Sequence, residues 1–261
     1  MTGKLLHAAL ALATLYTAPL QAGECKARSG AHTTALVELY TSEGCDSCPP
    51  ADRWLAALAS RGHGPDRLVP IALHVDYWDY IGWKDPYAKA LFSSRQRRLA
   101  QVMRAKIVYT PQVLLQGEDF RRWYAPAFDE AVAKINSRPA RARIELALDR
   151  PAGGNLPVEV HAEVFEPAHR GDAGLYLAAY ENKLVSAVAS GENRGKTLMH
   201  DYVALEWVGP IGFGQDGRAS VRRALPLLPK AIGANSGVVA FVQNRANAEV
   251  LQALMLPACS G

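Results

Sequence analysis

Two cysteines separated by two residues, Cys45 and Cys48, are the side chains of this chain best suited to chemistry. Such a pair can close a small disulfide ring, and its thiolates can attack the disulfide of another protein. A short apolar run over residues 36–40 precedes the pair, a turn ends at Gly44, and an amphipathic helix is predicted to begin near Pro50. A strand, a turn, a Cys-x-x-Cys pair and a helix in this order predict a redox site.

The two cysteines are expected to differ in role. The first cysteine of such a pair is usually the more exposed one, so we predict that Cys45 attacks a substrate sulfur and that Cys48 resolves the mixed disulfide. Glu38 lies within the apolar run, where burial would raise the pKa of its carboxyl group toward a range useful for proton transfer. A glutamate that faces water on an edge strand is the alternative for Glu38. A permanent structural disulfide is the alternative for the cysteine pair.

Two further stretches are predicted to line the site. A second apolar run over residues 68–75 ends in a loop rich in aromatic and acidic residues, and Trp78 of this loop is a predicted substrate contact. Ligands bind at strand ends in α/β sheets, although an aromatic lid over the core is the alternative. Pro111 opens a later apolar run, where a proline indicates an edge strand or a cis peptide bond. We predict a cis Thr110–Pro111 bond against the cysteine pair, with Tyr109 and Thr110 contacting the substrate.

A metal site is the alternative use of the same residues. His74 ends the second apolar run, and with Cys45 and Cys48 it would offer two sulfur ligands and one imidazole nitrogen to copper or zinc. A lone histidine near a core is more often a hydrogen-bonded structural residue. The leading expectation is therefore a site without a metal or another cofactor.

The first residues of the chain are typical of a secretory signal. Residues 1–22 hold Lys4, then a short apolar run, then small residues before a cleavage point. The apolar run is too short to cross a bilayer, and no later stretch is long enough. We therefore expect a periplasmic or secreted mature protein without a membrane span.

Export determines how the remaining cysteines are interpreted. Disulfides persist in oxidising compartments, so all four cysteines are expected to be oxidised or to cycle between redox states. A Cys45–Cys48 bridge leaves Cys25 and Cys259, one near each end of the mature chain, for a structural disulfide. Unpaired thiols at frayed termini are the alternative. The net charge of +4 is small, and the basic residues form no stripe interleaved with aromatic residues. Both observations argue against a nucleic-acid partner.

The pattern of apolar residues changes near residue 139. Before it, apolar runs alternate with helical patterns. After it, short apolar runs are separated by Pro, Gly, Asn and Asp, which is typical of a β-sandwich. A domain boundary is therefore predicted there. Beyond it, residues 192–194 and 200–201 form a polar cluster between strands, which is interpreted as an ordinary loop, with contact to the redox face as the alternative.

Residues 33–138 resemble the thioredoxin superfamily in their order of strands, helices, Cys-x-x-Cys pair and Thr-Pro strand. In that superfamily a proline preceded by Thr, Ile or Val lies in cis against the cysteine pair, which Thr110-Pro111 matches. Thioredoxin also has a buried acid that serves proton transfer to the resolving cysteine, one residue nearer the pair than Glu38. With one extra residue in the turn, the resemblance implies this role for Glu38. The chain resembles an uncharacterised family of bacterial secreted proteins, the domain of unknown function 1223, more closely still. The matching stretches are Glu38–Asp52, His74–Asp79, Tyr109–Gln112 and Gly191–Gly195.

This resemblance implies a thioredoxin-like fold with a β-rich partner and assigns no substrate. The predicted fold class is an α/β thioredoxin-like N-terminal domain over residues 23–139, followed by a mainly-β, sandwich-like C-terminal domain over residues 140–261. The predicted function is that of an exported thiol–disulfide oxidoreductase acting on protein thiols or disulfides. A membrane-bound redox protein is a candidate partner.

Overall fold

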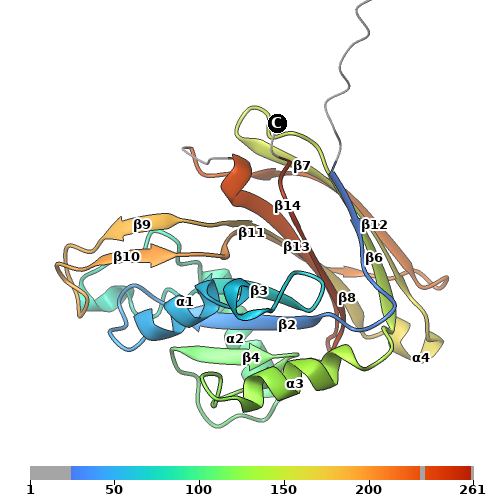
Figure 1. Cartoon of the computed structure of the whole chain (residues 1–261), viewed down its shortest axis with the longest axis horizontal. Coiled ribbons are helices and arrows are strands. Elements are labelled where there is room, and N and C mark those ends of the chain that lie inside the picture. Colours follow the sequence, from blue (N-terminus) through green and yellow to red (C-terminus); the bar gives the residue numbers. More distant parts are fainter. Residues whose placement is uncertain (1–24, 230–232, 260–261) are drawn as a thin grey trace, which may run out of the picture.

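The computed structural model describes residues 25–229 and 233–259, so the predicted signal peptide 1–22 lies outside the described residues. Its strands form an eight-stranded mixed sheet, a four-stranded antiparallel sheet and a two-stranded hairpin (Figure 1). No helix among the described residues is long and apolar enough to cross a membrane.

The eight-stranded sheet has the order β14-β13-β8-β11-β3-β2-β4-β5. Its strands are β2 (Ala35–Thr41), β3 (Leu68–His74), β4 (Gln112–Leu115), β5 (Glu118–Asp119), β8 (Ala173–Glu181), β11 (Val203–Gly212), β13 (Ser236–Asn244) and β14 (Val250–Pro257). The four-stranded sheet consists of β1 (Cys25–Arg28), β6 (Ala142–Leu148), β7 (Asn155–Val164) and β12 (Arg218–Pro226). The hairpin consists of β9 (Leu184–Ala187) and β10 (Thr197–His200).

The two faces of the eight-stranded sheet are covered differently. On one face lies α2 (Ala90–Val102), packed on side chains of β2, β3, β8, β11 and β13. On the other face, α1 (Pro49–Ala56) and α3 (Ala127–Asn136) cover β2, β3 and β4. The remaining helices are the short α4 (Pro167–Arg170), η1 (Ala59–Arg61), η2 (Asp79–Ile81) and η3 (Gly233–Asn235).

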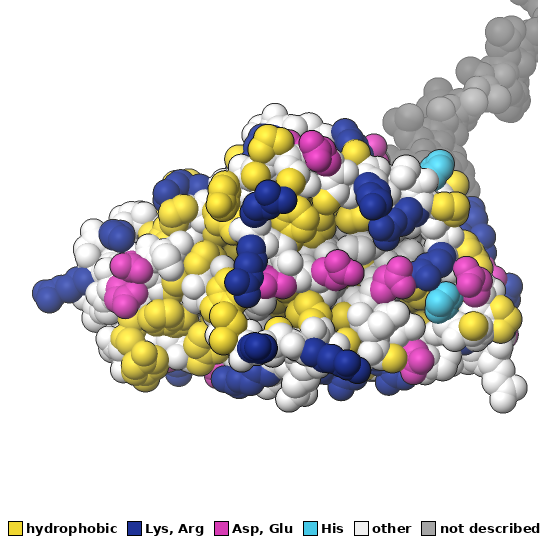
Figure 2. Space-filling view, turned by 90° about the horizontal axis from the view of Figure 1, so that it is seen from below, with side chains coloured by type: hydrophobic (Ala, Val, Ile, Leu, Met, Phe, Trp, Pro, Cys, Tyr) yellow, Lys and Arg dark blue, Asp and Glu magenta, His cyan; other side chains and the backbone are white. Residues whose placement is uncertain are grey.

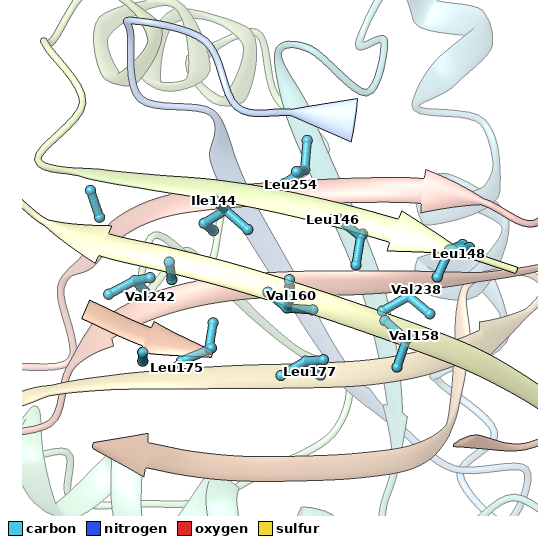
Figure 3. Packing of buried hydrophobic residues seen from close by; sticks show 14 of the residues in the cluster. Ile144, Leu146, Leu148, Val158, Val160, Leu175, Leu177, Val238, Val242 and Leu254 are labelled. Carbon is cyan, nitrogen blue, oxygen red and sulfur yellow. The ribbon is translucent and has the colours of Figure 1, made fainter. Parts of the chain in front are cut away.

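The four-stranded sheet packs against β8, β13 and β14 on the same face as α1 and α3. Their shared core is aliphatic, with Ile144 and Val160 facing Leu177 and Val242 (Figure 3). The outer face of this sheet meets solvent, so β7 alternates between buried and partly exposed residues. All seven residues of β2 are buried, because both of its faces are covered.

The predicted fold class, an α/β thioredoxin-like domain followed by a separate β-sandwich-like domain, is wrong. Val203 of β11 pairs in parallel with Ala72 of β3, so strands from both halves of the chain form one sheet. β1, near the N-terminus, pairs with β6 in the other sheet. The predicted boundary at residue 139 falls between α3 and β6, and both sheets cross it. A run of apolar residues indicates that a strand is buried, but it does not indicate which strand lies beside it. For this reason the sequence pattern suggested two separate units.

The charges on the surface are mixed. On the face shown in Figure 2, Lys and Arg side chains are spread among Asp and Glu, and hydrophobic side chains gather toward one end. On the outer face of the four-stranded sheet, basic and acidic residues of neighbouring strands pair, as Arg143 does with Glu163.

Candidate functional site

The end of β2 and the start of α1 hold Cys45 and Cys48 in a disulfide, with Cα atoms 5.5 Å apart. Cys48 is the N-cap of α1, and the helix begins at Pro49, close to the predicted start at Pro50. Proline suits this first turn because its missing N–H would have no helical partner. Both cysteines are buried, with 1% of Cys45 and none of Cys48 exposed. Cys45, predicted to be the more exposed sulfur, is therefore covered here.

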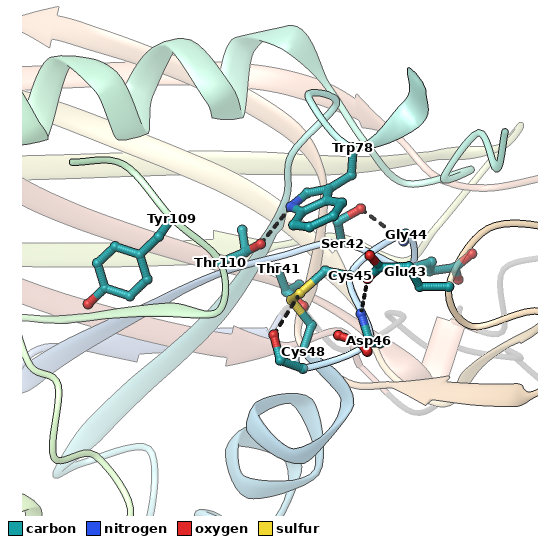
Figure 4. The surroundings of a disulfide bond; sticks show 12 residues. Thr41, Ser42, Glu43, Gly44, Cys45, Asp46, Cys48, Trp78, Tyr109 and Thr110 are labelled. Atoms are coloured by element: carbon teal, nitrogen blue, oxygen red, sulfur yellow. Dashed lines mark hydrogen bonds between the residues drawn. A yellow bond between two sulfur atoms is a disulfide. The ribbon is translucent and has the colours of Figure 1, made fainter. Parts of the chain in front are cut away.

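Trp78 and Thr110 lie beside the disulfide (Figure 4). The indole Nε1 of Trp78 donates to Thr110 Oγ1 across 2.7 Å, which joins the aromatic loop after β3 to the segment before β4. The Thr110–Pro111 peptide bond is cis, as the sequence predicts. Two of the predicted substrate contacts, Trp78 and Thr110, are thus brought to the sulfur atoms.

Tyr109, the third predicted substrate contact, points away from the disulfide (Figure 4). Its hydroxyl donates to Asp119 Oδ1 across 2.8 Å. Burial and the neighbouring Asp119 carboxylate raise the pKa of Tyr109 to about 12. The side chain therefore holds β5 to the Thr-Pro segment.

The loop between β9 and β10 holds the cysteine turn from the other side. Asn193 is fully buried, and its Nδ2 donates to the carbonyl oxygens of Glu43 at 2.8 Å and Cys45 at 2.9 Å. Glu192 accepts a hydrogen bond from the backbone N–H of Asp46. Sequence reasoning treated this loop as ordinary, and the only available signal was its Gly191–Gly195 motif. Gly191 has φ +74 and packs against Trp83, which a larger residue would crowd.

A buried cluster of two histidines and three acids adjoins the cysteine turn. His74 Nδ1 lies 2.7 Å from Asp85 Oδ2, and His200 Nε2 lies 3.0 Å from Glu43 Oε1. The two imidazole rings are 4.9 Å apart and nearly perpendicular. Asp52 of α1 completes the cluster, with His200 Nδ1 3.9 Å from its Oδ2. His200, for which the sequence favours an ordinary polar loop, is thus placed in this cluster by the structure.

The charges of the His74–Asp85 pair support one another. Burial opposes a charged imidazole, but the surrounding acids, Asp85 before Asp52 and Glu43, together outweigh burial and raise the pKa of His74. Burial likewise opposes a charged carboxylate, but His74 and two backbone N–H donors lower the pKa of Asp85. Both shifts favour the charged form of each partner, and neither side chain is exposed to solvent.

The alternative metal ligands are otherwise engaged. Cys45 and Cys48 are bonded to each other, and His74 Nδ1 is taken by Asp85. Among the residues that the structure describes, no group of three or more His, Cys, Asp or Glu side chains is arranged to hold a metal ion. The unpartnered nitrogens of the cluster are His74 Nε2 and His200 Nδ1.

Glu38, the predicted proton-transfer residue, lies on the face of β2 opposite α1. Successive side chains of a strand point to opposite faces, so Glu38 and Tyr40 face α2 while Leu39 faces α1. Both oxygens of Glu38 accept hydrogen bonds from Arg95, at 2.7 and 2.9 Å, and Oε2 also accepts one from Tyr40. The guanidinium of Arg95 lies over the aromatic rings of three residues, Tyr176, Trp207 and Phe241.

Cys25 and Cys259 form the second disulfide, with Cα atoms 5.8 Å apart and 234 residues between them in sequence. Cys25 opens β1, and Cys259 follows β14. The four cysteines of the chain therefore form one local bridge and one bridge between the ends. Two disulfides are typical of a protein that matures outside the cytoplasm.

The model of the family described as Protein of unknown function (DUF1223) matches residues 36–243. The chain belongs to this family. The match spans the cysteine pair, Asn193 and His200, and it crosses the predicted domain boundary. The DUF1223 unit therefore contains both halves of the site. No curated protein matches the sequence.

Two solved structures are similar to this chain. A crystal structure of a protein from Agrobacterium tumefaciens has a TM-score of 0.64 and 23% identity, and the match covers 89% of this chain and 98% of that one. HBP35 of Porphyromonas gingivalis has a TM-score of 0.68 and 16% identity, and the match covers 88% of this chain and 76% of that one. At these identities the likeness concerns the fold alone.

Proposed function

We propose that this protein is an exported thiol–disulfide oxidoreductase whose working group is the Cys45–Cys48 disulfide. The observation that carries the proposal is the place of this disulfide at the N-terminus of α1, between polar residues from three separate segments. A helix N-terminus stabilises a nearby thiolate, and thiolates are the species that exchange disulfides. A bridge needed only for stability would not require this setting.

The reaction begins at Cys45. A thiolate of the partner attacks Cys45 Sγ, the bond to Cys48 breaks, and a mixed disulfide joins the partner to Cys45. A second partner thiol then displaces Cys45, so the partner is oxidised and the pair is reduced. The reverse sequence, with Cys48 as the resolving thiol, oxidises the pair. Protein thiols or disulfides are the proposed substrates.

The cover over the disulfide determines the direction of approach. Ser47 is exposed, and its hydroxyl lies 3.4 Å from Cys45 Sγ. Trp78 and Thr110 occupy another side, and Asn193 holds the turn itself. A partner sulfur is expected to approach past Ser47, with a small displacement of Trp78 exposing Cys45.

The proposed location is the periplasm or the exterior of the cell. An oxidising compartment keeps the Cys25–Cys259 bridge closed, so that only the local pair cycles. Continuous turnover then requires an electron donor or acceptor. A membrane-bound redox protein is the proposed source.

A thiol-trapping titration against glutathione redox buffers tests this function. We expect the Cys45–Cys48 bridge to open and close reversibly in the folded protein, while the Cys25–Cys259 bridge stays closed. Mass spectrometry of alkylated peptides separates the two bridges, and a Cys45→Ser/Cys48→Ser variant is the control. A Cys45–Cys48 bridge that resists strong reductant in the native protein would make the pair structural and defeat the proposal.

A further inference from the structure

Asp52 lies one helical turn beyond Cys48 on α1. The backbone N–H of Asp52 donates to the carbonyl of Cys48 across 3.2 Å, and Cys48 itself has helical dihedral angles. Side chains four residues apart on a helix are neighbours, with Cβ atoms about 5–6 Å apart. Asp52 is therefore the carboxyl group that the helix places beside the resolving cysteine.

The two carboxyl oxygens of Asp52 have different neighbours. Thr41 Oγ1, at the end of β2, donates to Oδ1 across 2.8 Å. Oδ2 faces His200 Nδ1 of β10 at 3.9 Å, and that nitrogen is buried without a hydrogen-bond partner. The other charged neighbours of Asp52 are His74 of β3 and Asp85 of the following loop.

Burial is the main influence on this carboxyl. It raises the pKa of Asp52 above the ordinary value, and the charges of His200 and His74 and the Thr41 hydrogen bond offset only part of the rise. Asp52 is 8% exposed, whereas Cys48 has no exposed surface. A proton can therefore reach Asp52 from water more readily than it can reach Cys48.

We propose that Asp52 carries the proton to and from Cys48 and that His200 positions its carboxyl for this transfer. This inference rests on the proposed function. It assigns to Asp52 the role that the sequence analysis gave to Glu38, whose oxygens are held by Arg95 on the opposite face of β2. Glu43 holds His200 through Nε2, which turns Nδ1 toward Asp52.

The proton and electron counts close over one cycle. A partner thiolate attacks Cys45 Sγ, and Cys48 leaves with the electron pair of the broken S–S bond. Asp52 gives its proton to Cys48 Sγ and becomes a carboxylate facing His200. The partner's second thiol loses a proton to water and attacks the partner sulfur of the mixed disulfide, which releases Cys45 as a thiolate. Cys45 and Asp52 each take a proton from water, and the partner has lost two electrons and two protons.

The return direction uses Asp52 as the base. Cys48 has to lose its proton before it can attack a mixed disulfide at Cys45, and it is buried away from water. A carboxylate at Asp52 accepts that proton. The rate of resolution should therefore depend on the protonation state of Asp52.

Resolution of a glutathione adduct tests this step. The reduced protein is mixed with glutathione disulfide between about pH 5 and pH 9, quenched in acid, and the adduct at Cys45 is counted by mass spectrometry. In Asp52→Asn we expect the adduct to accumulate, resolution to slow about 10²-fold, and the inflection due to Asp52 to vanish from the pH profile. Asp52→Glu should restore part of the rate with a shifted inflection. His200→Gln should shift the inflection with a smaller loss of rate.

Asp46→Asn is the matched control, because Asp46 is an exposed acid next to Cys45. The pH profile of its rate of resolution should have the same shape as that of the wild type. Failure of the wild type to form or resolve any adduct would defeat the proposed function itself. A wild type that turns over while Asp52→Asn and Asp52→Glu keep its rate and pH profile would overturn the role of Asp52 alone.

Discussion

The side-chain amide of Asn193 donates to the carbonyl oxygen of Cys45 across 2.9 Å, although 148 residues separate the two in sequence. The same amide also reaches the carbonyl of Glu43. A residue of the β9–β10 loop thus satisfies two buried acceptors of the cysteine turn. The conformation of the cysteine turn depends on a segment from the far half of the chain.

Asn193→Ala should remove one hydrogen bond from each of these two buried carbonyls, so that, within the described part of the chain, Cys45 keeps only the bond from the backbone N–H of Cys48. We expect the free energy of unfolding to fall by about 1–3 kcal/mol and the Cys45–Cys48 bridge to be reduced faster, since the turn loses its support. Urea unfolding and thiol trapping measure the two effects. Asn155→Ala, which removes an exposed bond to Gly153, is the control. Equal trapping rates in wild type and Asn193→Ala would contradict this account.

Arg95→Met should be strongly destabilising, because it leaves the buried Glu38 carboxylate without its counter-charge. Removal of one partner of a buried ion pair costs about 3–5 kcal/mol. A double-mutant cycle with Glu38→Gln, followed by urea unfolding, measures the coupling. Arg121→Met breaks the exposed pair with Asp119 and should change little. A coupling energy near zero would show that the two buried charges do not depend on each other.

The His74–Asp85 pair should make stability depend on pH. Since Asp85 raises the pKa of His74 above its ordinary 6.5, the folded protein binds this proton more tightly than the unfolded chain. The resulting stability is complete below pH 6.5 and is lost as the pH rises through the folded-state pKa. The raised pKa of Asp52 acts in the same direction, over the range between its unfolded and folded values.

Urea unfolding from about pH 5 to pH 9 measures this dependence. We expect the wild type to lose stability on the alkaline side and His74→Asn to show a flatter curve. His161→Gln is the control, because the side chain of His161 is largely exposed. Parallel curves for the wild type and His74→Asn would rule out His74 as the titrating group.

Loss of the Cys25–Cys259 bridge should destabilise the whole protein and leave the Cys45–Cys48 pair unchanged. The bridge closes a loop of nearly the full mature chain, and removal of a native disulfide typically costs about 2–5 kcal/mol. Thermal unfolding of Cys25→Ser/Cys259→Ser measures the loss. Thiol exchange at Cys45 and Cys48 should proceed at the wild-type rate. A variant as stable as the wild type would mean that the ends are held by β1 and β14 alone.

The local parts of the site could be predicted from the sequence. The strand, turn and helix around Cys45 and Cys48 follow from short apolar patterns and prolines, which act over a few residues. The cis Thr110–Pro111 bond follows from a proline that opens a strand of the sheet. Each of these features is decided by nearby residues.

The long-range parts could not be predicted. The pairing of β3 with β11 and the placing of His200 beside Glu43 depend on which strands are neighbours, which apolar patterns do not encode. The placing of Glu38 away from α1 has a local reason that the sequence did contain. Glu38 and Thr41 are three residues apart on one strand, so they point to opposite faces, and only Thr41 faces α1.

The position of β11 beside β3 has a consequence for the order in which the chain is synthesised. Residues 25–139 emerge first, with the edge of β3 unpaired and the cysteine turn not yet held by Asn193. During that interval the two thiols are open to an oxidant, and an uncovered strand edge is open to other chains. When β10 and β11 are in place, β11 covers the edge of β3 and the loop before β10 holds the cysteine turn. A fragment ending at residue 139 should therefore be oxidised easily and aggregate easily.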